Sequence, residues 1–453
     1  MNRFPVPSRI RQFATRFHDA GFSLYIVGGA VRDQVIGRST NDYDFATDAL
    51  PQQVVALFRN VVPTGIKHGT VTVLLRGESY EVTTFRTDGT YDDHRHPEQV
   101  HFVSSLADDL SRRDFTINAL AAHARTGEII DLHGGMRDIE DKCIRAIGDP
   151  LLRFTEDALR LLRGCRFSAQ LEFSIEQTTL HAMYSLAHTL VSVSGERVRA
   201  ELFKILDAGR PSVGLRAMQK CGALEVLLPE LAEGASVTQK GNHRFDVLDH
   251  AIACCDAAPR GKPLVRLAAL LHDIGKPRSK AVSSDGEVTF HQHEIISAQL
   301  AKGILDRLKC SNEEKSTVLN LIRNHMFHYT EEWTDGAVRR FINRVGCDAI
   351  ADLFDLRRAD RMAINGDSRF DDLVDFMKRI ERVLAESSAM TVRELRINGN
   401  DLAALGIPRG PLMGRVLDML LQTVLDDPSQ NEPERLRTIA RLFHEQRIDV
   451  HGR

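Results

Sequence analysis

The sequence lacks the features of membrane, secreted and zinc-ribbon proteins. Its 453 residues contain no apolar run long enough to cross a bilayer, and the stretch after Met1 is too polar for a signal peptide. The seven cysteines form no CxxC pair and no regular framework, so reduced thiols are expected and a zinc ribbon is disfavoured. No internal repeat or low-complexity tract is present. The net charge is only −3, so a nucleic-acid partner would have to be held by a local basic surface.

The hydrophobic pattern predicts a small α/β head followed by helical modules. With 43% hydrophobic and 27% charged residues the composition is ordinary, and the length predicts two to four domains. Apolar residues at helical spacing precede the strand pattern SLYIV, and TVTVLL and YEVTTF read as paired strands joined by the turn RGES. After GDP at 148–150 helical patterns dominate, and ASVTQKGNHR at 235–244 has the composition of a linker. The predicted fold class is α+β, with a mixed sheet in the head.

Two aspartates separated by one residue, Asp42 and Asp44 in STNDYDFAT, suggest a site for a divalent metal. In an extended chain both carboxylates share one face, and two neighbouring anions repel each other unless a cation lies between them. Mg²⁺ takes such oxygen ligands, usually together with substrate phosphates. An isolated pair of this kind is more often a solvated turn, so the neighbouring residues decide between the two interpretations.

The residues before the aspartates predict a phosphate-binding turn. Gly28 and Gly29 lie between a predicted strand and a predicted helix, where backbone N–H groups and the helix dipole favour a phosphate. A glycine pair alone is common in tight turns, but Arg32 and Asp33 follow in the first helical turn. The combination of glycines, arginine and paired carboxylates suits nucleotidyl transfer, in which one metal activates the attacking hydroxyl and another neutralises the leaving pyrophosphate.

Five motifs, in family order, resemble the DNA polymerase beta-like nucleotidyltransferases. Within them the chain resembles the class II tRNA nucleotidyltransferases, or CCA-adding enzymes, and the bacterial poly(A) polymerases. The motifs are GGAVRD…DYDFAT, RRDFTINAL at 112–120, DLHGGMRDI at 131–139, EDALRLLR at 156–163 and ERVRAEL at 196–202. The resemblance implies a polymerase beta-like head followed by an all-helical neck.

The resemblance also implies a nucleotide site in the head. RRDFTINAL matches the ribose-recognition motif, and Arg113 and Asp114 precede Asn118 by about one helical turn, so they can converge on sugar hydroxyls. Glu81 in YEVTTF occupies the place of a third carboxylate that the superfamily often carries, although a solvated strand glutamate is an equal alternative. The implied catalytic residues are Asp42, Asp44 and Glu81, with Asp42 and Asp44 as the Mg²⁺ ligands.

Asp157 and Arg160 are three residues apart in TEDALRLLRGCRF, on one face if this segment is a continuous helix. Such pairs are usually surface ion pairs of little energetic value. The resemblance implies that this pair replaces a template base. A carboxylate only accepts hydrogen bonds and a guanidinium only donates them, so the pair matches cytosine and adenine and rejects uracil and guanine. Arg163 and Arg166 on the same segment are expected to contact the nucleotide.

The polar segment RTDGTYDDHRHPEQV at 86–100 reads as a plain surface loop from its composition. The resemblance implies the flexible loop that relatives need for adding A, and that relatives adding only C lack. Its presence favours complete CCA addition, or A addition, over addition of CC alone.

A second set of residues in the helical half resembles the HD phosphohydrolases, whose histidines and aspartates hold one or two divalent metals in a helical bundle. Each residue alone is more often structural. Imidazole and carboxylate ligands suit Ni²⁺, Mn²⁺ or Mg²⁺, and a bound metal would generate hydroxide for phosphoester hydrolysis. His291 could take the place of His293. The implied ligands are His250, His272, Asp273, His293, His325 and Asp360.

Together these patterns predict four domains: head 1–148, neck 149–236, HD domain 237–366 and helical tail 367–453. RNA contacts are expected on basic positions of the neck (Arg153, Arg197 and Arg199) and on the arginine-rich tail from Arg435. A tRNA acceptor stem would be held by phosphate and shape contacts rather than by base reading.

The sequence therefore predicts a cytoplasmic, Mg²⁺-dependent enzyme that adds or repairs the 3′-CCA of tRNA from CTP and ATP without a template. Additional phosphatase or 2′,3′-cyclic phosphodiesterase activity is expected from the HD domain. A poly(A) polymerase or an A-adding tRNA nucleotidyltransferase shares the head motifs and stays an alternative. An HD phosphohydrolase whose head only docks RNA is an alternative from another class. No membrane partner is expected, and the pattern does not predict an oligomeric state.

Overall fold

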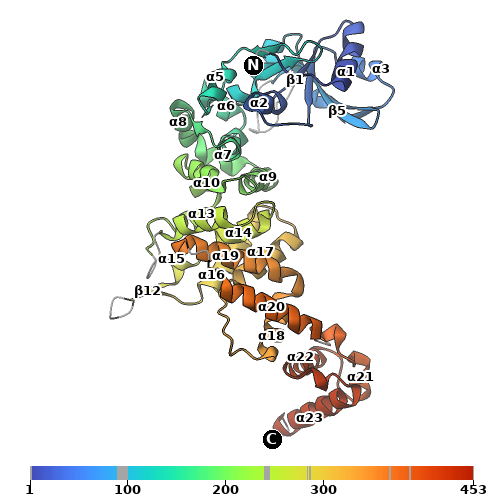
Figure 1. Cartoon of the computed structure of the whole chain (residues 1–453), viewed down its shortest axis with the longest axis vertical. Helices are drawn as coiled ribbons and strands as arrows, with labels where there is room; N and C mark the ends of the chain where they lie inside the picture. The colour runs from blue at the N-terminus through green and yellow to red at the C-terminus, as the bar shows by residue number, and fades with distance from the viewer. Residues whose placement is uncertain are drawn as a thin grey trace. The chain divides into compact units, whose positions relative to one another are not determined.

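The computed structural model describes residues 3–88, 100–238, 245–282, 284, 287–366, 369–386 and 389–451 (Figure 1). The chain divides into two compact units, Met1–Glu233 with Ile304–Cys310, and Gly234–Gly303 with Ser311–Arg453. The predicted α+β class is confirmed, because the large sheet lies in the first unit and helices dominate the chain after residue 150. None of the helices in the described ranges is both long enough and apolar enough to pass through a bilayer.

The head is built on a seven-stranded mixed sheet with the order β3-β4-β5-β2-β1-β8-β9. Only β2 and β5 pair in parallel; the other neighbours are antiparallel. The strands are β1 (Leu24–Val27), β2 (Asp44–Thr47), β3 (Val61–Gly65), β4 (Thr70–Leu75), β5 (Glu78–Thr84), β8 (Leu120–His123) and β9 (Ile129–Asp131). The predicted hairpin is confirmed: Leu75 pairs with Glu78 across Arg76 and Gly77, which both have positive φ.

Apolar side chains from one face of the sheet pack against the first helix. α1 (Ser8–Asp19) buries Ile10, Phe13, Ala14 and Phe17, the set expected from its helical spacing. Phe13 contacts Phe45 of β2 and Tyr80 of β5 with ring centroids 5.3 and 4.5 Å away. The remaining head helices are α2 (Gly29–Ile36), α3 (Pro51–Leu57), α4 (Leu106–Ser111) and α5 (Gly135–Glu140).

Short paired strands flank the predicted loop at 86–100. β6 (Arg86–Asp88) and β7 (Val100–Phe102) form an antiparallel pair, with Arg86 opposite Phe102. The central part of that loop, residues 89–99, lies outside the described residues, as do residues 239–244 of the predicted linker.

The neck is helical, as predicted, but its first helix is shorter than the sequence pattern suggests. α6 (Pro150–Glu156) ends before Asp157, whose backbone is extended (φ −145°, ψ 106°), and α7 begins at Leu159 and runs to Leu171. The continuous helix predicted for TEDALRLLRGCRF is therefore wrong. The Asp157 carboxylate accepts a hydrogen bond from the Leu159 N–H at 3.0 Å, which favours a break there. The neck continues with α8 (Gln177–Leu186), α9 (Gly195–Leu206), α10 (Pro211–Lys220), α11 (Ala223–Leu227) and α12 (Pro229–Ala232).

The second unit contains a helical bundle in which α13 packs on α14 and α19, and α14 packs on α17. The helices are α13 (Val247–Ala257), α14 (Pro263–Leu271), α15 (Lys276–Ser279), α16 (His293–Arg307, shared with the first unit), α17 (Asn312–Asn324), α18 (Asp335–Val345) and α19 (Ile350–Asn365). A small hairpin, β12 (Lys280–Val282) with β13 (Val288–Phe290), precedes α16. The tail consists of α20 (Asp371–Glu386), α21 (Gly399–Ala404), α22 (Pro411–Asp426) and α23 (Pro433–His451).

Candidate active sites

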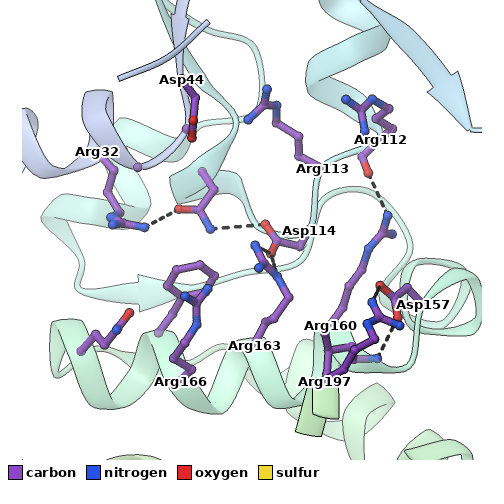
Figure 2. Close-up of a pocket in the computed structure, with 16 residues that line it drawn as sticks. Arg32, Asp44, Arg112, Arg113, Asp114, Asp157, Arg160, Arg163, Arg166 and Arg197 are labelled. Carbon is purple, nitrogen blue, oxygen red and sulfur yellow. Dashed lines mark hydrogen bonds and ion pairs between the residues drawn. The ribbon is translucent and has the colours of Figure 1, made fainter. Parts of the chain in front are cut away.

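A cavity of about 530 Å³ in the first unit is lined by the glycine turn and the strand ends on one side and by α7 on the other (Figure 2). It brings together all ten residues that the sequence predicted for nucleotide binding, the predicted metal ligand Asp44 and the predicted RNA contact Arg197. These are Gly28, Gly29, Arg32, Asp44, Arg113, Asp114, Asn118, Asp157, Arg160, Arg163, Arg166 and Arg197. Arg112, Leu159, Phe167 and Gln170 complete the lining.

Three carboxylates gather at the strand end beside the cavity. Asp44 opens β2, where it is the register partner of Val27 in β1 and of Glu81 in β5. Asp42 lies two residues before Asp44, outside the strand, and neither Asp42 nor Glu81 belongs to the cavity lining. Burial raises the pKa of Asp44, and the charge of Asp42 raises it further. The pKa of Glu81 is raised by burial and then by Asp44 and Asp42. A divalent cation between these carboxylates would relieve their mutual repulsion, and the three groups offer the oxygen ligands that such a cation prefers.

The glycine turn approaches the arginines of the site too closely for a side chain. Gly28 has φ +69° and donates its N–H to the Leu120 carbonyl at 3.1 Å. A Cβ at this position would lie 3.2 Å from Nη1 of Arg113. The positive φ therefore favours glycine at this position, and a Cβ would in addition require the Arg113 guanidinium to shift.

A chain of hydrogen bonds links the first helix of the site to the neck. Arg32 donates to the Asn118 side-chain oxygen at 2.6 Å, and the Asn118 amide donates to Asp114 at 3.3 Å. Asp114 accepts in turn from Arg163 at 2.7 Å. Burial opposes the ionisation of Asp114, but Arg163 outweighs it and the pKa of Asp114 is lowered. The predicted approach of Asp114 to Asn118 is confirmed, through the 3₁₀ turn Thr116–Asn118.

Asp157 and Arg160 both face the cavity but do not pair with each other (Figure 2). Asp157 Oδ2 forms an ion pair with Arg197 of α9 at 2.8 Å. Arg160 pairs with Glu156 and donates to the backbone carbonyls of Arg153 and Arg112 at 3.0 and 3.1 Å. Each group is thus held from a different direction, which orients an acceptor and a donor separately.

Two of the residues predicted to bind RNA lie outside this cavity. Arg153 pairs with Glu156 at 3.0 Å and lines a smaller cavity of about 240 Å³ together with Arg112. Arg199 donates to the Lys309 carbonyl at 2.8 Å. Arg197 lies in the cavity itself, beside Asp157.

The sequence interpretation missed residues that support the arginines from behind. Asp109 is buried and binds Arg112 at 2.8 Å and Arg113 at 3.2 Å. Its place three and four residues before these arginines, at helical spacing, could have revealed it. Glu201, which pairs with Arg166 at 2.8 Å, and Phe167, which packs against several guanidinium groups, offered no comparable pattern.

The second unit brings all six predicted HD residues into one buried cluster. The cluster has two groups of potential metal ligands, His250, His272 and Asp273, and Asp273, His293 and His325. In each group the ligand atoms lie within 4.8 Å of one another, and Asp273 belongs to both. Asp360 Oδ1 lies 3.1 Å from Nε2 of His250. His293 is buried and lies 3.2 Å from Asp273, whereas His291 is exposed and belongs to neither group.

The donors of this cluster fit a divalent metal. His272, His293 and His325 each place Nδ1 within 2.8 Å of a backbone carbonyl, which favours a proton on Nδ1 and leaves Nε2 as a ligand. Both carboxylate oxygens of Asp273 and Nε2 of His293 are buried without a well-oriented hydrogen-bond partner among the described residues. Burial opposes ionisation of Asp273, but His272 and Lys276 hold its pKa well below the usual range. Imidazoles and carboxylates without thiolates suit Mn²⁺, Ni²⁺ or a similar ion.

Comparison with known proteins matches both sites. Residues 24–145 match the family described as "Poly A polymerase head domain", residues 172–234 match "Probable RNA and SrmB- binding site of polymerase A", and residues 241–364 match "HD domain". The CCA-adding enzyme of Streptococcus thermophilus is 34% identical over 92% of this chain and 92% of its own length. The chain belongs to the CCA-adding enzyme family. The poly(A) polymerase alternative is not favoured, because the Streptococcus thermophilus relative, which aligns over nearly the whole chain, is a CCA-adding enzyme.

Other CCA-adding enzymes are more similar in sequence but align over less than half of this chain. The relative from Leuconostoc mesenteroides is 52% identical over 44% of this chain, and that from Levilactobacillus brevis is 47% identical over 48%. These alignments span about half of the relatives, 50% and 58% of their lengths. Both the nucleotidyltransferase and the HD families depend on metals.

The fold matches that of solved CCA-adding enzymes. The structure of the Bacillus stearothermophilus enzyme in complex with CTP has a TM-score of 0.71 and 27% identity, covering 97% of this chain and 98% of the other. The Thermotoga maritima enzyme complexed with tRNA has a TM-score of 0.54 and 20% identity, covering 95% of this chain and 94% of the other, which supports the fold alone.

Proposed function

We propose that the chain adds or repairs the 3′-terminal CCA of tRNA from CTP and ATP without a nucleic-acid template. The observation that carries this proposal is the single cavity in which Gly28 and Asp44 face Asp157 and Arg160. A triphosphate and its base would thereby be held by opposite walls of one site. We also propose the domain boundaries given above and a cytoplasmic location, which suits cysteines that form no disulfide in the described part of the chain.

In this proposal Asp42 and Asp44 hold Mg²⁺, with Glu81 beside them, and the bound metal would supply charge for the attacking hydroxyl and the leaving pyrophosphate. The residues of the chain do the positioning. Seven arginines and three aspartates line the cavity, so its wall carries net positive charge that suits a triphosphate. Asp114 and Asn118 are placed to bind the ribose hydroxyls, as both are buried at the cavity wall.

The base would be chosen by Asp157 as acceptor and Arg160 as donor. Arg197 fixes the position of the Asp157 carboxylate, and Glu156 with two backbone carbonyls holds Arg160. A wrong base would leave one of these groups without a partner on the base, which would weaken its binding by about 1–3 kcal/mol per group. Arg153, Arg197 and Arg199 lie on the neck and are proposed to follow the RNA backbone.

The test is extension of purified tRNA lacking its CCA end, with CTP and ATP supplied separately and together. We expect addition of CC with CTP alone and of CCA with both nucleotides. Asp44→Asn should lower kcat by at least about 10³-fold, as expected for loss of a ligand to the catalytic metal. Asp19→Asn, which changes an exposed carboxylate of α1 outside the cavity lining, is the matched control and should retain activity. Addition of A to tRNA-CC without any extension of tRNA lacking all three residues, or A tails on unrelated RNA without C addition, would contradict the proposal.

A second activity is favoured by the buried cluster around Asp273. We propose that its four histidines and two aspartates hold a divalent metal, Mn²⁺, Ni²⁺ or Mg²⁺, and that the second unit hydrolyses phosphoesters, as a phosphatase or 2′,3′-cyclic phosphodiesterase. The bound metal would supply a hydroxide nucleophile. Lys276, whose Nζ lies 2.6 Å from Asp273, adds a positive charge at the edge of the cluster that would attract a phosphate.

A further inference from the structure

The aromatic ring of Phe167 contacts three of the arginines that line the nucleotide cavity. The guanidinium carbon of Arg166 lies 4.0 Å from the ring centroid, that of Arg32 lies 5.3 Å away and that of Arg163 lies 5.4 Å away. Arg32 belongs to α2 in the head, whereas Arg163 and Arg166 belong to α7 in the neck. One ring therefore joins cations from both walls of the site.

The surroundings of Phe167 fix the ring in place. Its side chain is buried, and its ring makes a T-shaped contact with Phe115, with the two centroids 5.9 Å apart and the planes at 81°. An edge-to-face neighbour of this kind limits rotation of the ring. The ring presents its electron-rich face to the guanidinium groups. A cation is attracted to that face when it lies within about 6 Å of the ring centroid.

The three arginines differ in how well other groups compensate their charge, and so in how much they depend on the Phe167 ring. Arg32 and Arg163 have well-oriented hydrogen bonds to Asn118 and Asp114. Arg166 lies 2.8 Å from Glu201, but its Nε and the Glu201 oxygen are not aligned for a hydrogen bond. Burial, opposed in part by Glu201, and repulsion from Arg163 lower the pKa of Arg166 to about 10. Arg166 remains charged at neutral pH, and it is the arginine closest to the ring.

We propose that Phe167 is a positioning residue for the nucleotide triphosphate: its ring holds the guanidinium groups of Arg32, Arg163 and Arg166 together against their mutual repulsion. This inference rests on the proposed nucleotide site. Because the ring acts through the arginines, its loss weakens triphosphate affinity more than it slows the chemical step. An aliphatic side chain of similar size would exclude water equally well but would not attract the three cations.

The test replaces Phe167 with phenylalanines carrying one, two and three ring fluorines in the full-length protein. Fluorination keeps the shape of the ring and progressively removes its negative face. We expect the Kd and KM for CTP and ATP to rise stepwise, by about tenfold for the trifluoro ring, while kcat changes less than about twofold. The Tm should stay within about 2 °C of that of the unmodified protein. Phe167→Leu should raise the same constants by a similar factor.

Phe173, a buried phenylalanine of the same unit, is the matched control. No guanidinium lies over its ring in the part of the chain that the structure describes, so its fluorination should leave nucleotide affinity unchanged. The proposal is overturned if CTP affinity is constant along the Phe167 series, or if the Phe173 series weakens it equally. A protein that binds CTP but extends no tRNA would refute the proposed function alone, and the affinity series would still decide the role of Phe167.

Discussion

At the scale of single residues, buried acids hold a crowded set of arginines in the nucleotide cavity. Asp109, Asp114 and Glu201 are each nearly inaccessible to water and each pairs with an arginine of the lining. A buried carboxylate or guanidinium is costly without its partner, so the acids and the arginines stabilise each other. The charge that suits a triphosphate is therefore also a condition of folding.

Asp109→Asn should reveal this dependence. Burial opposes ionisation of Asp109, but Arg112 and Arg113 outweigh it and its pKa is lowered in the folded protein. Its contribution is therefore fully present above the unfolded pKa of about 3.9 and is lost as the pH falls through the lower folded value. We expect the variant to be less stable by about 3 kcal/mol at pH 7, with a smaller difference near pH 3. Urea unfolding followed by circular dichroism measures both.

The exposed neighbour Asp108 provides the control for this prediction. Asp108→Asn should change stability by less than about 0.5 kcal/mol at either pH, as is usual for a surface position. A loss for Asp109→Asn that is equal at both pH values would show that packing, rather than the ionised carboxylate, is what the variant removes.

At the scale of elements, the spacing of apolar residues predicted the helices and strands that bury one face. The spacing of Ile10, Phe13 and Phe17 predicted α1, and the alternation in TVTVLL predicted β4, because burial of one face sets both periods. The end of α6 was not predictable in the same way. The leucines of TEDALRLLRGCRF all follow Asp157, so their helical spacing does not show where α6 ends. The break is marked by the side-chain hydrogen bond from the Leu159 N–H to Asp157.

The candidate site was predicted as a set of residues but not as a set of contacts. The spacing of the motif predicted that Asp157 and Arg160 share one face of a helix. In the structure Asp157 instead pairs with Arg197, forty positions further along the chain. Likewise the Phe167 ring and Glu201 acquire their roles only through packing of α7 against the head and against α9. Such long-range pairings depend on tertiary geometry, which no local period encodes.

Close packing of α7 on α10 makes Gly214 a sensitive position. A Cβ there would lie 2.8 Å from Cβ of Ala169, 2.9 Å from the Cys165 carbonyl oxygen and 2.9 Å from a methyl group of Ile205. Gly214→Ala gains about 1 kcal/mol of helix propensity but forces these elements apart, which costs about 1–3 kcal/mol. We expect the Tm to fall by about 2–4 °C for each kcal/mol of stability lost. CTP binding should also weaken, because α7 carries Arg160 and Arg163.

Gly209 offers the comparison, since nothing lies within 4 Å of a Cβ at that position and its φ is not positive. Gly209→Ala should leave Tm and CTP affinity unchanged or slightly raise the Tm. If both alanine variants behaved alike, close approach of α10 to α7 would not be the reason for a glycine at 214.

At the scale of the whole molecule, each candidate site is made from one unit only. The nucleotide cavity uses residues 28–197 and the histidine cluster uses residues 250–360, which lie on different sides of the division between the units. No described residue lines both sites. The two proposed activities can therefore be altered one at a time by substitution.

Crossed substitutions test this independence and the proposed hydrolase together. Asp273→Asn removes the carboxylate common to both ligand groups, so bound Mn²⁺ or Ni²⁺, measured by elemental analysis after dialysis, should fall to background. Hydrolysis of a 2′,3′-cyclic nucleotide should be lost with it, while CCA addition changes less than about twofold. Asp44→Asn should give the reverse pattern. Metal retained by Asp273→Asn would place the ion elsewhere. Loss of both activities in either variant would show that the two sites are coupled. For Asp273→Asn, it would mean that a change in the buried cluster reaches the nucleotide cavity through the fold.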